Sequence, residues 1–174
     1  MRYRTRRRAV LIASLTLGTL LLLTSAVALV FHQAVALPGA APLPATLAGL
    51  RLVESIYQGS AVEAINRLHG LDFSLSSAAV GAYQGQASAI LWVSGAPTSW
   101  HAMSLTKDMR NRIAEGNNPY TPLGEREVGG TIVYELEGLG QRHYYFRAGS
   151  LMIWLSVDEG LSETALQECL SFYR

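Results

Sequence analysis

The stretch that decides the fold runs from Val128 to Val157 and reads VGGTIVYELEGLGQRHYYFRAGSLMIWLSV. Its runs of β-branched and aromatic residues are separated by glycine-containing turns at 129–130, 138–140 and 149–150. Glycine accepts the positive φ angles of tight hairpin turns, so this spacing predicts antiparallel strands joined by hairpins. We expect these strands at residues 126–128, 131–137, 142–148 and 151–157.

Two details of this stretch limit its interpretation. The run Leu151–Leu155 is apolar at every position, which is typical of an interior strand with both faces covered. The Gly-x-Gly at residues 138–140 does not indicate a nucleotide site. Such a site needs a helix after its glycines, whereas a strand follows here.

Upstream, helix and strand patterns alternate. Ser60 and Glu63 have the spacing of a capping box, which predicts a helix that ends before Gly70. Residues 116–124 hold two Gly, two Pro and two Asn, which predicts an irregular loop. The remaining periodicities complete the expected elements, which are helices at 60–69, 99–115 and 162–172 and further strands at 74–83 and 87–94.

These elements predict one α+β domain over residues 47–174. We expect an antiparallel sheet of about five or six strands, with two or three helices packed mainly on one face. The sequence has 174 residues, and about 130 of them remain for this domain, which is an ordinary size for one hydrophobic core.

The N-terminal part has the pattern of a membrane anchor. Residues 1–8 include five arginines, and the uncharged run from Ala9 to Phe31 covers 23 residues, or about 34 Å of helix. The positive-inside rule keeps the arginines in the cytoplasm, which places the domain on the outer side of the cell membrane. Residues 32–46 contain three prolines and no charge and predict a short Pro/Ala spacer. This organisation is typical of small bacterial proteins with an extracytoplasmic domain.

A second interpretation of the N-terminal part remains open. Ala34-Val35-Ala36 has small residues at the two positions that a signal peptidase reads, so cleavage after Ala36 would release a secreted domain. The apolar run is longer than the 7 to 15 residues that secretory signals usually have, which favours retention as a signal-anchor.

Charge and cysteine content exclude some functions. All 13 acidic residues and nine of the 14 basic residues lie in residues 38–174, so the domain carries a formal charge of −4. A mildly acidic domain lacks the basic surface that phosphate backbones require, and we expect no nucleic acid partner. Cys169 is the only cysteine, so no intramolecular disulfide forms.

The best catalytic candidates lie in the hairpin of strands 131–137 and 142–148. If the core takes the more apolar side of each strand, Glu135 and Glu137 lie on the outer face with His143 and Arg147. A histidine beside a carboxylate acts as a general base, and a nearby arginine holds an anionic substrate. Cross-strand charge pairing on a solvated face explains the same residues without chemistry.

Two hypotheses about function follow from the sequence. The first is a non-catalytic binding or accessory module, anchored in the lipid bilayer by residues 9–31 and working with another membrane or extracytoplasmic protein. The second is an extracytoplasmic hydrolase or metal-binding protein that uses the Glu/His group. The motifs that mark nucleotide, serine-hydrolase and structural zinc sites do not occur in the chain, so we expect no cofactor and no metal.

Overall fold

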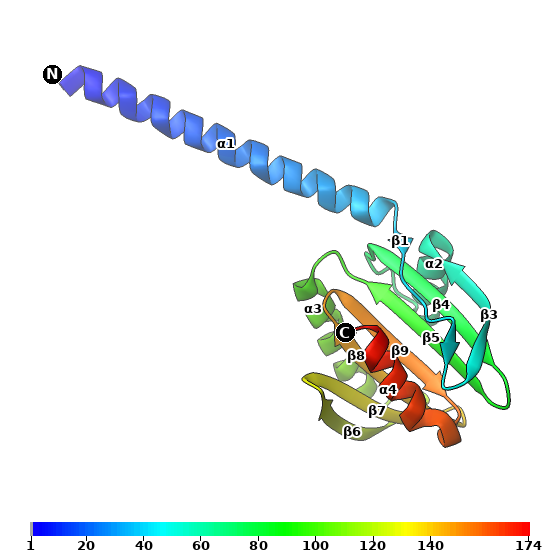
Figure 1. The fold of residues 1–174 in the computed structure, drawn as a ribbon. Coiled ribbons are helices and arrows are strands. Elements are labelled where there is room, and N and C mark those ends of the chain that lie inside the picture. The colour runs from blue at the N-terminus through cyan, green and yellow to red at the C-terminus, as the bar shows by residue number, and fades with distance from the viewer. Residues whose placement is uncertain (1) are drawn as a thin grey trace.

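A long apolar helix leads into the domain. The computed structural model describes residues 2–174, and Figure 1 shows α1 (Arg2–Ala36) projecting from one end of the globular part. Within α1, residues Ile12–Gln33 are long and apolar enough to cross a membrane, a property that a signal sequence near the N-terminus shares. The side chains of the predicted basic flank, residues 1–8, lie outside the described part of the structure.

The domain is built around one curled antiparallel sheet. Its strands follow the order β2-β3-β4-β5-β9-β8-β7-β6, and β1 pairs in parallel with β4. The predicted hairpin turns are present, because β6 to β9 are consecutive along the chain and adjacent in the sheet. The strands are β1 (Gly39–Ala40), β2 (Thr46–Leu47), β3 (Leu50–Tyr57), β4 (Ser77–Gln84), β5 (Ser88–Gly95), β6 (Tyr120–Val128), β7 (Thr131–Gly138), β8 (Gln141–Ala148) and β9 (Leu151–Val157).

Helices cover both faces of the sheet. The helices α2 (Gln58–His69) and α3 (Ser99–Ala114) pack on one face, and α4 (Ser162–Phe172), which follows the short helix η1 (Glu159–Leu161), packs on the other. Figure 1 shows α4 in front of the sheet and α3 behind it. We refer to these surfaces as the α4 face and the α2–α3 face.

The α4 face holds the main hydrophobic core. Leu91 of β5 lies opposite Leu155 of β9 in the two central strands, and neither side chain is exposed. The apolar side of α4 packs on these strands through Ala165, Leu166, Cys169 and Leu170, all buried. Ala41, Leu47 and Leu50 close the same core from the N-terminal side.

The α2–α3 face is more aromatic. Trp92 of β5 lies opposite Trp154 of β9, one residue along from the leucine pair and therefore on the other side of the sheet. Trp92 belongs to the cluster beneath α2, while Trp154 belongs to the cluster beneath the C-terminal half of α3.

The sheet has more strands than the five or six predicted. No strand was expected at Leu50–Tyr57, and residues 116–124 were expected to form an irregular loop, although β6 begins at Tyr120. Proline is tolerated in edge strands, and Pro122 lies in such a strand beside a β-bulge that ends at Gly124. The capping-box prediction was also wrong, because α2 starts at Gln58 after Tyr57 and has no side-chain cap.

The predicted spacer is largely part of the domain. Gly39 and Ala40 pair with Ser77 and Ala78 of β4, and the Pro44 carbonyl accepts a hydrogen bond of 2.8 Å from the buried Tyr83 hydroxyl. Polar backbone groups of a Pro/Ala segment can be satisfied by a sheet edge as well as by water, which composition alone does not distinguish. Only residues 37 and 38 separate α1 from β1.

Candidate functional site

The register of the hairpin β7–β8 separates the predicted catalytic residues. Glu135 pairs with Tyr144, Leu136 with His143 and Glu137 with Arg142. Side chains alternate along each strand, so His143 points to the α2–α3 face while both glutamates lie on the α4 side. The prediction that a glutamate opposes His143 was therefore wrong.

The error came from the assumption of a single core. That assumption placed the apolar residues Tyr134 and Leu136 on the same face as Tyr144 and Phe146. Instead, Leu136 is buried on the α2–α3 face and Phe146 on the α4 face, because helices cover both sides of the sheet. When both faces are apolar, hydrophobicity no longer selects the register, and a shift of one residue changes every pairing.

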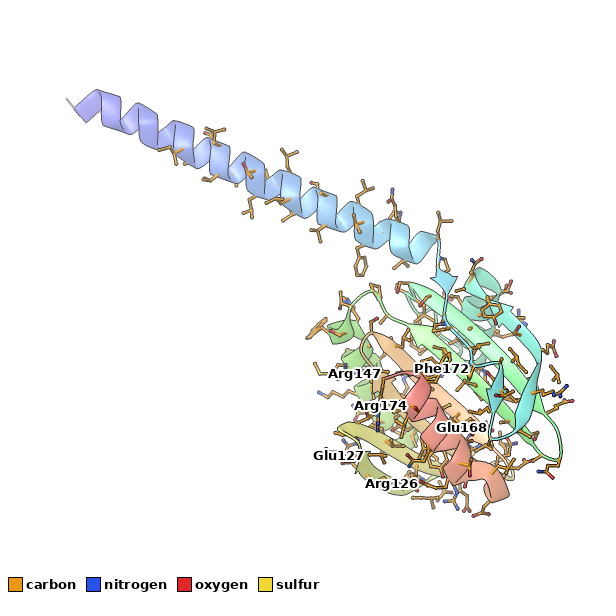
Figure 2. The ribbon with its side chains drawn as sticks, viewed as in Figure 1. Arg126, Glu127, Arg147, Glu168, Phe172 and Arg174 are labelled. Carbon is orange, nitrogen blue, oxygen red and sulfur yellow. The ribbon has the colours of Figure 1, made fainter. Side chains whose placement is uncertain are left out.

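Glu135 and Arg147 have partners other than His143. Glu135 forms a 2.5 Å ion pair with Arg126 of β6, and Arg126 makes a second one of 2.5 Å with Glu163 of α4. The hydrogen bond to Glu163 is the main cause that raises the pKa of Arg126. Glu137 is exposed. The Arg147 guanidinium donates to the Gly149 carbonyl at 2.9 Å, and alternation along β8 places Arg147 on the same face as His143. Figure 2 shows Arg147 well apart from Arg126, the partner of Glu135.

His143 is a buried histidine with both ring nitrogens engaged. Its Nδ1 accepts a hydrogen bond of 3.2 Å from the Trp154 indole, which leaves Nε2 protonated to donate to the Gly138 carbonyl at 2.9 Å. The ring is only 2% exposed, and burial lowers the pKa of His143. A neutral imidazole in this tautomer holds the end of β7 against β9, and neither nitrogen has a lone pair free for a substrate.

Aromatic rings surround His143 on the α2–α3 face. Tyr134, Tyr145 and Trp154 form a stack with centroid separations of 4.6 Å and 5.5 Å. Tyr120 of the edge strand contacts His143 edge-on at 4.8 Å. Arg110 of α3 lies over the outer face of the Tyr134 ring, 5.7 Å from its centroid. This cluster ties α3 and β6 to the sheet.

A polar network joins three strand ends near this cluster. The Asp158 carboxylate accepts hydrogen bonds from the backbone and hydroxyl of Ser88 and, at 2.9 Å, from the Gln141 amide. The Ser156 hydroxyl donates to the Gln141 side chain. The hydrogen bonds from Gln141 and Ser88, that of Gln141 foremost, lower the pKa of Asp158. Sequence reasoning missed the network because its members are spread over 70 residues of chain and carry no motif.

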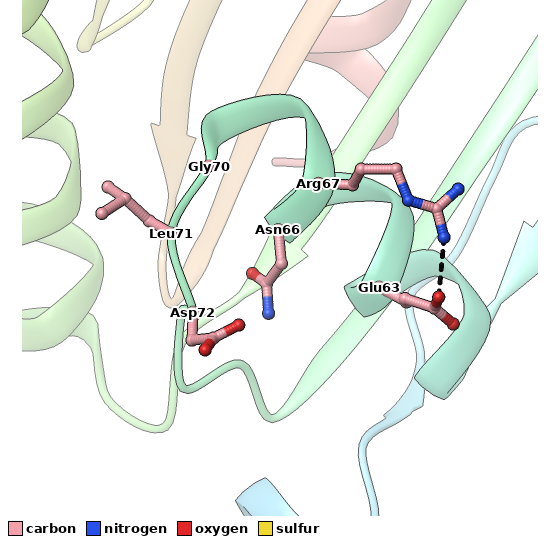
Figure 3. Close-up of a pocket in the computed structure, with 6 residues that line it drawn as sticks. All are labelled: Glu63, Asn66, Arg67, Gly70, Leu71 and Asp72. Atoms are coloured by element: carbon pink, nitrogen blue, oxygen red, sulfur yellow. Dashed lines mark hydrogen bonds and ion pairs between the residues drawn. The ribbon is translucent and has the colours of Figure 1, made fainter.

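The end of α2 forms a shallow hollow on the surface (Figure 3). Its polar groups largely serve the helix itself. Arg67 pairs with Glu63 at 2.6 Å, and the Asn66 side chain accepts a hydrogen bond from the Phe73 backbone at 3.0 Å. Gly70 ends the helix in the left-handed conformation with φ of 61°. The arrangement indicates a helix terminus and no particular class of ligand.

The two sheet edges differ in their protection. Beyond Leu52, whose backbone N–H donates to the Ala45 carbonyl, the described chain places no strand on the outer side of β3 as far as Tyr57. This open edge includes Val53, which is 56% exposed at a β-bulge. The opposite edge, β6, carries Pro122 and a run of charges at 125–127. Proline and charged side chains on an edge strand disfavour pairing with a strand of another molecule. The edge of β3 is therefore the less protected of the two.

Two further residues have structural roles. His69 lies at the end of α2, where its Nδ1 is 2.8 Å from the Ile65 carbonyl oxygen. Cys169 is fully buried, and burial raises the pKa of its thiol to about 12, so the reactive thiolate is scarce at neutral pH. Within residues 2–174 no three His, Cys, Asp or Glu side chains lie close enough together to hold a metal ion.

Comparison with known proteins identifies no similar family, protein or structure. No protein-family model matches the chain, and no curated protein and no solved structure is significantly similar to it.

Proposed function

We propose that the protein is a membrane-anchored, extracytoplasmic binding or accessory module that does no chemistry itself and engages a partner close to the bilayer. We base this role on the short junction between α1 and the domain and on the unprotected edge of β3. The second hypothesis, a hydrolase built on Glu135, Glu137 and His143, finds no support in a register that separates the glutamates from the histidine.

The observation that carries this proposal is the junction between α1 and the sheet. Ala36 ends the helix and Gly39 already pairs with Ser77 of β4, which leaves two residues between the anchor and the domain. A flexible linker would let the domain search a large volume, whereas this connection keeps it at the membrane surface. Such a geometry suits a module that acts on a neighbour in the same membrane.

The same junction favours retention of the anchor over cleavage. Ala34-Val35-Ala36 forms the last part of α1, and the sheet begins three residues after it. A peptidase that reads this triplet in an extended form would have to unwind the end of α1 next to the folded domain.

The open edge of β3 is the surface we assign to the partner. Residues 53–57 present unpaired backbone groups, and an extended segment of another protein can satisfy them by adding a strand. Exposed side chains of this edge, such as Val53 at the β-bulge, would then contribute specificity.

Membrane retention is tested by fractionation of cells that express the full-length chain. We expect the intact protein in the membrane pellet after an alkaline wash. The variant Leu22→Arg, which places a charge in the middle of the apolar segment at a cost of about 3 kcal/mol, should reduce that fraction strongly. Recovery of a soluble wild-type form that starts at Leu37 would contradict anchoring.

Partner binding is tested by a photo-crosslinking residue introduced at Val53. The matched control carries the same residue at Leu123, which is also exposed but lies on the protected edge β6. We expect a discrete crosslinked species in native membranes from position 53 and none from position 123. Equal yields at both positions, or none at either, would contradict the assignment of the β3 edge.

A further inference from the structure

The start of α3 lies beside the membrane end of α1. The ring centroids of Phe31 and His101 are 5.5 Å apart, and those of His101 and Trp100 are 5.2 Å apart. Phe31 is two residues from the end of the apolar segment Ile12–Gln33. Figure 1 shows the start of α3 on the side of the domain toward which α1 extends.

This contact sets the depth of Trp100. If Ile12–Gln33 crosses the hydrocarbon core, Phe31 lies at its outer boundary, where lipid tails give way to headgroups. His101 and Trp100 follow Phe31 by successive ring contacts and therefore reach the same level. Tryptophan is enriched at this level in membrane proteins because its ring is amphipathic.

The exposed side of α3 has the chemistry of a lipid interface. Trp100, Met103 and Lys107 recur at spacings of three and four residues and thus share one stripe of the helix. Trp100 is 66% exposed and Met103 is 52% exposed, while the buried side of α3 faces the sheet through Ala102 and Thr106. In water, such a pair of large apolar side chains is an unfavourable exposure, whereas the interface accepts both.

Lys107 completes the stripe with a cation. It lies about 10 Å farther along the helix than Trp100, at 1.5 Å per residue, and is therefore more distant from the start of α3. Lysine stems lie along apolar surface while the ammonium group reaches headgroup phosphates. Two apolar side chains are thus followed by a cation, which is the same order as in a leaflet, where the apolar tails are followed by the charged headgroups.

We infer that the stripe Trp100-Met103-Lys107 is a second membrane contact, which docks the first turns of α3 into the outer leaflet beside α1. The contact rests on the proposed anchoring by α1 and deepens it by naming a lipid surface as the partner of α3. With α1 and α3 both seated, the domain has one fixed orientation. In that orientation the hairpin turn at Leu139 points away from the bilayer, because it lies at the opposite end of β8 from the turn beside the start of α3.

Tryptophan quenching measures this contact directly. The full-length chain is reconstituted into phosphatidylcholine and phosphatidylglycerol vesicles whose lipids carry bromine near the headgroup. We expect Trp100→Phe to remove at least about half of the bromine-dependent quenching, since Trp100 is the interfacial ring. The matched control Trp92→Phe, which alters a half-buried ring on the sheet, should leave the quenching unchanged.

A thiol at position 103 provides an independent readout. Cys169 is buried with its pKa raised to about 12, so a single introduced cysteine is the reactive one. Met103→Cys should react at least about tenfold more slowly with a membrane-impermeant maleimide in vesicles than in detergent, because the leaflet excludes the reagent. Leu139→Cys, exposed at the distal turn, should react equally fast in both.

The outcomes separate this inference from the proposed anchoring. Vesicles that fail to carry the protein on flotation would overturn both. If the vesicles carry the protein while Trp100→Phe is quenched like the wild type and Met103→Cys reacts at its detergent rate, the lipid contact alone is overturned. Loss of quenching together with slow labelling supports the contact.

Discussion

The two faces of the sheet are stabilised by different kinds of interaction. The α4 face is a mainly aliphatic core in which Leu91 and Leu155 meet beneath α4, with no exposed part of either side chain. The α2–α3 face contains a buried histidine, stacked aromatic rings and a polar network at one end. The first depends on packing volume, which is insensitive to pH, whereas the second depends on hydrogen bonds with a defined protonation state.

The difference shows which face could be misread as a catalytic site. A histidine, serines and an aspartate gather with tyrosine rings on the α2–α3 side, yet the polar side-chain atoms of the histidine, the serines and the aspartate bind other side chains or the backbone. Among the described residues, no buried side-chain nitrogen or oxygen lacks a hydrogen-bond partner. A satisfied network stabilises one arrangement of strands and leaves little capacity for a substrate.

The largest expected effect comes from a cavity on the α4 face. Leu155→Ala removes a fully buried side chain and should lower the free energy of unfolding by about 3 kcal/mol. Ile132→Ala, at a position of β7 that is half exposed, should change it by less than about 0.5 kcal/mol. Urea titration of the detergent-solubilised chain checks both, and equal losses would show that the α4 face is not the main core.

A smaller and pH-dependent effect is expected on the α2–α3 face. His143→Phe keeps the ring volume but leaves the Trp154 N–H and the Gly138 carbonyl without partners, which should cost about 1 to 3 kcal/mol at neutral pH.

The pH profile distinguishes this role from simple packing. Burial lowers the pKa of folded His143, so the unfolded chain takes up its proton first as the pH falls. The wild type should therefore be most stable above the unfolded pKa of about 6.5 and lose stability as the pH falls from there through the folded pKa. The variant should lack this component, and identical pH slopes in the two proteins would refute the assignment.

The smallest effect is expected at the rim of the α4 face. Arg126→Gln removes the ion pairs to Glu135 and Glu163, which are partly exposed and screened by solvent. We expect a loss below about 1 kcal/mol that shrinks further at high salt. Thermal unfolding at low and high ionic strength measures it, and a loss that does not depend on salt would show that the stem of Arg126 acts by packing instead.

The candidate site was less predictable than the elements that carry it. The strands of Glu135 and His143 were placed correctly from alternation and turns, but their pairing depended on a register that helices on both faces determine. The open edge of β3 was missed, although the two-residue turn Ala48-Gly49 directly before Leu50–Tyr57 was a signal for a hairpin. The contact between Phe31 and His101 joins residues 70 positions apart, and local patterns carry no information about it.

The sequence by itself determined the apolar anchor-like helix, the glycine hairpins from β6 to β9 and the last two helices, because each depends on neighbours within a few residues. Only the tertiary structure decided that Gly39–Ala40 and Thr46–Leu47 pair with the sheet, that His143 faces away from the glutamates, and that α3 starts beside α1. These features depend on which surfaces pack together. A strand with two apolar faces is compatible with more than one register, and the packing of helices on both faces selects one of them.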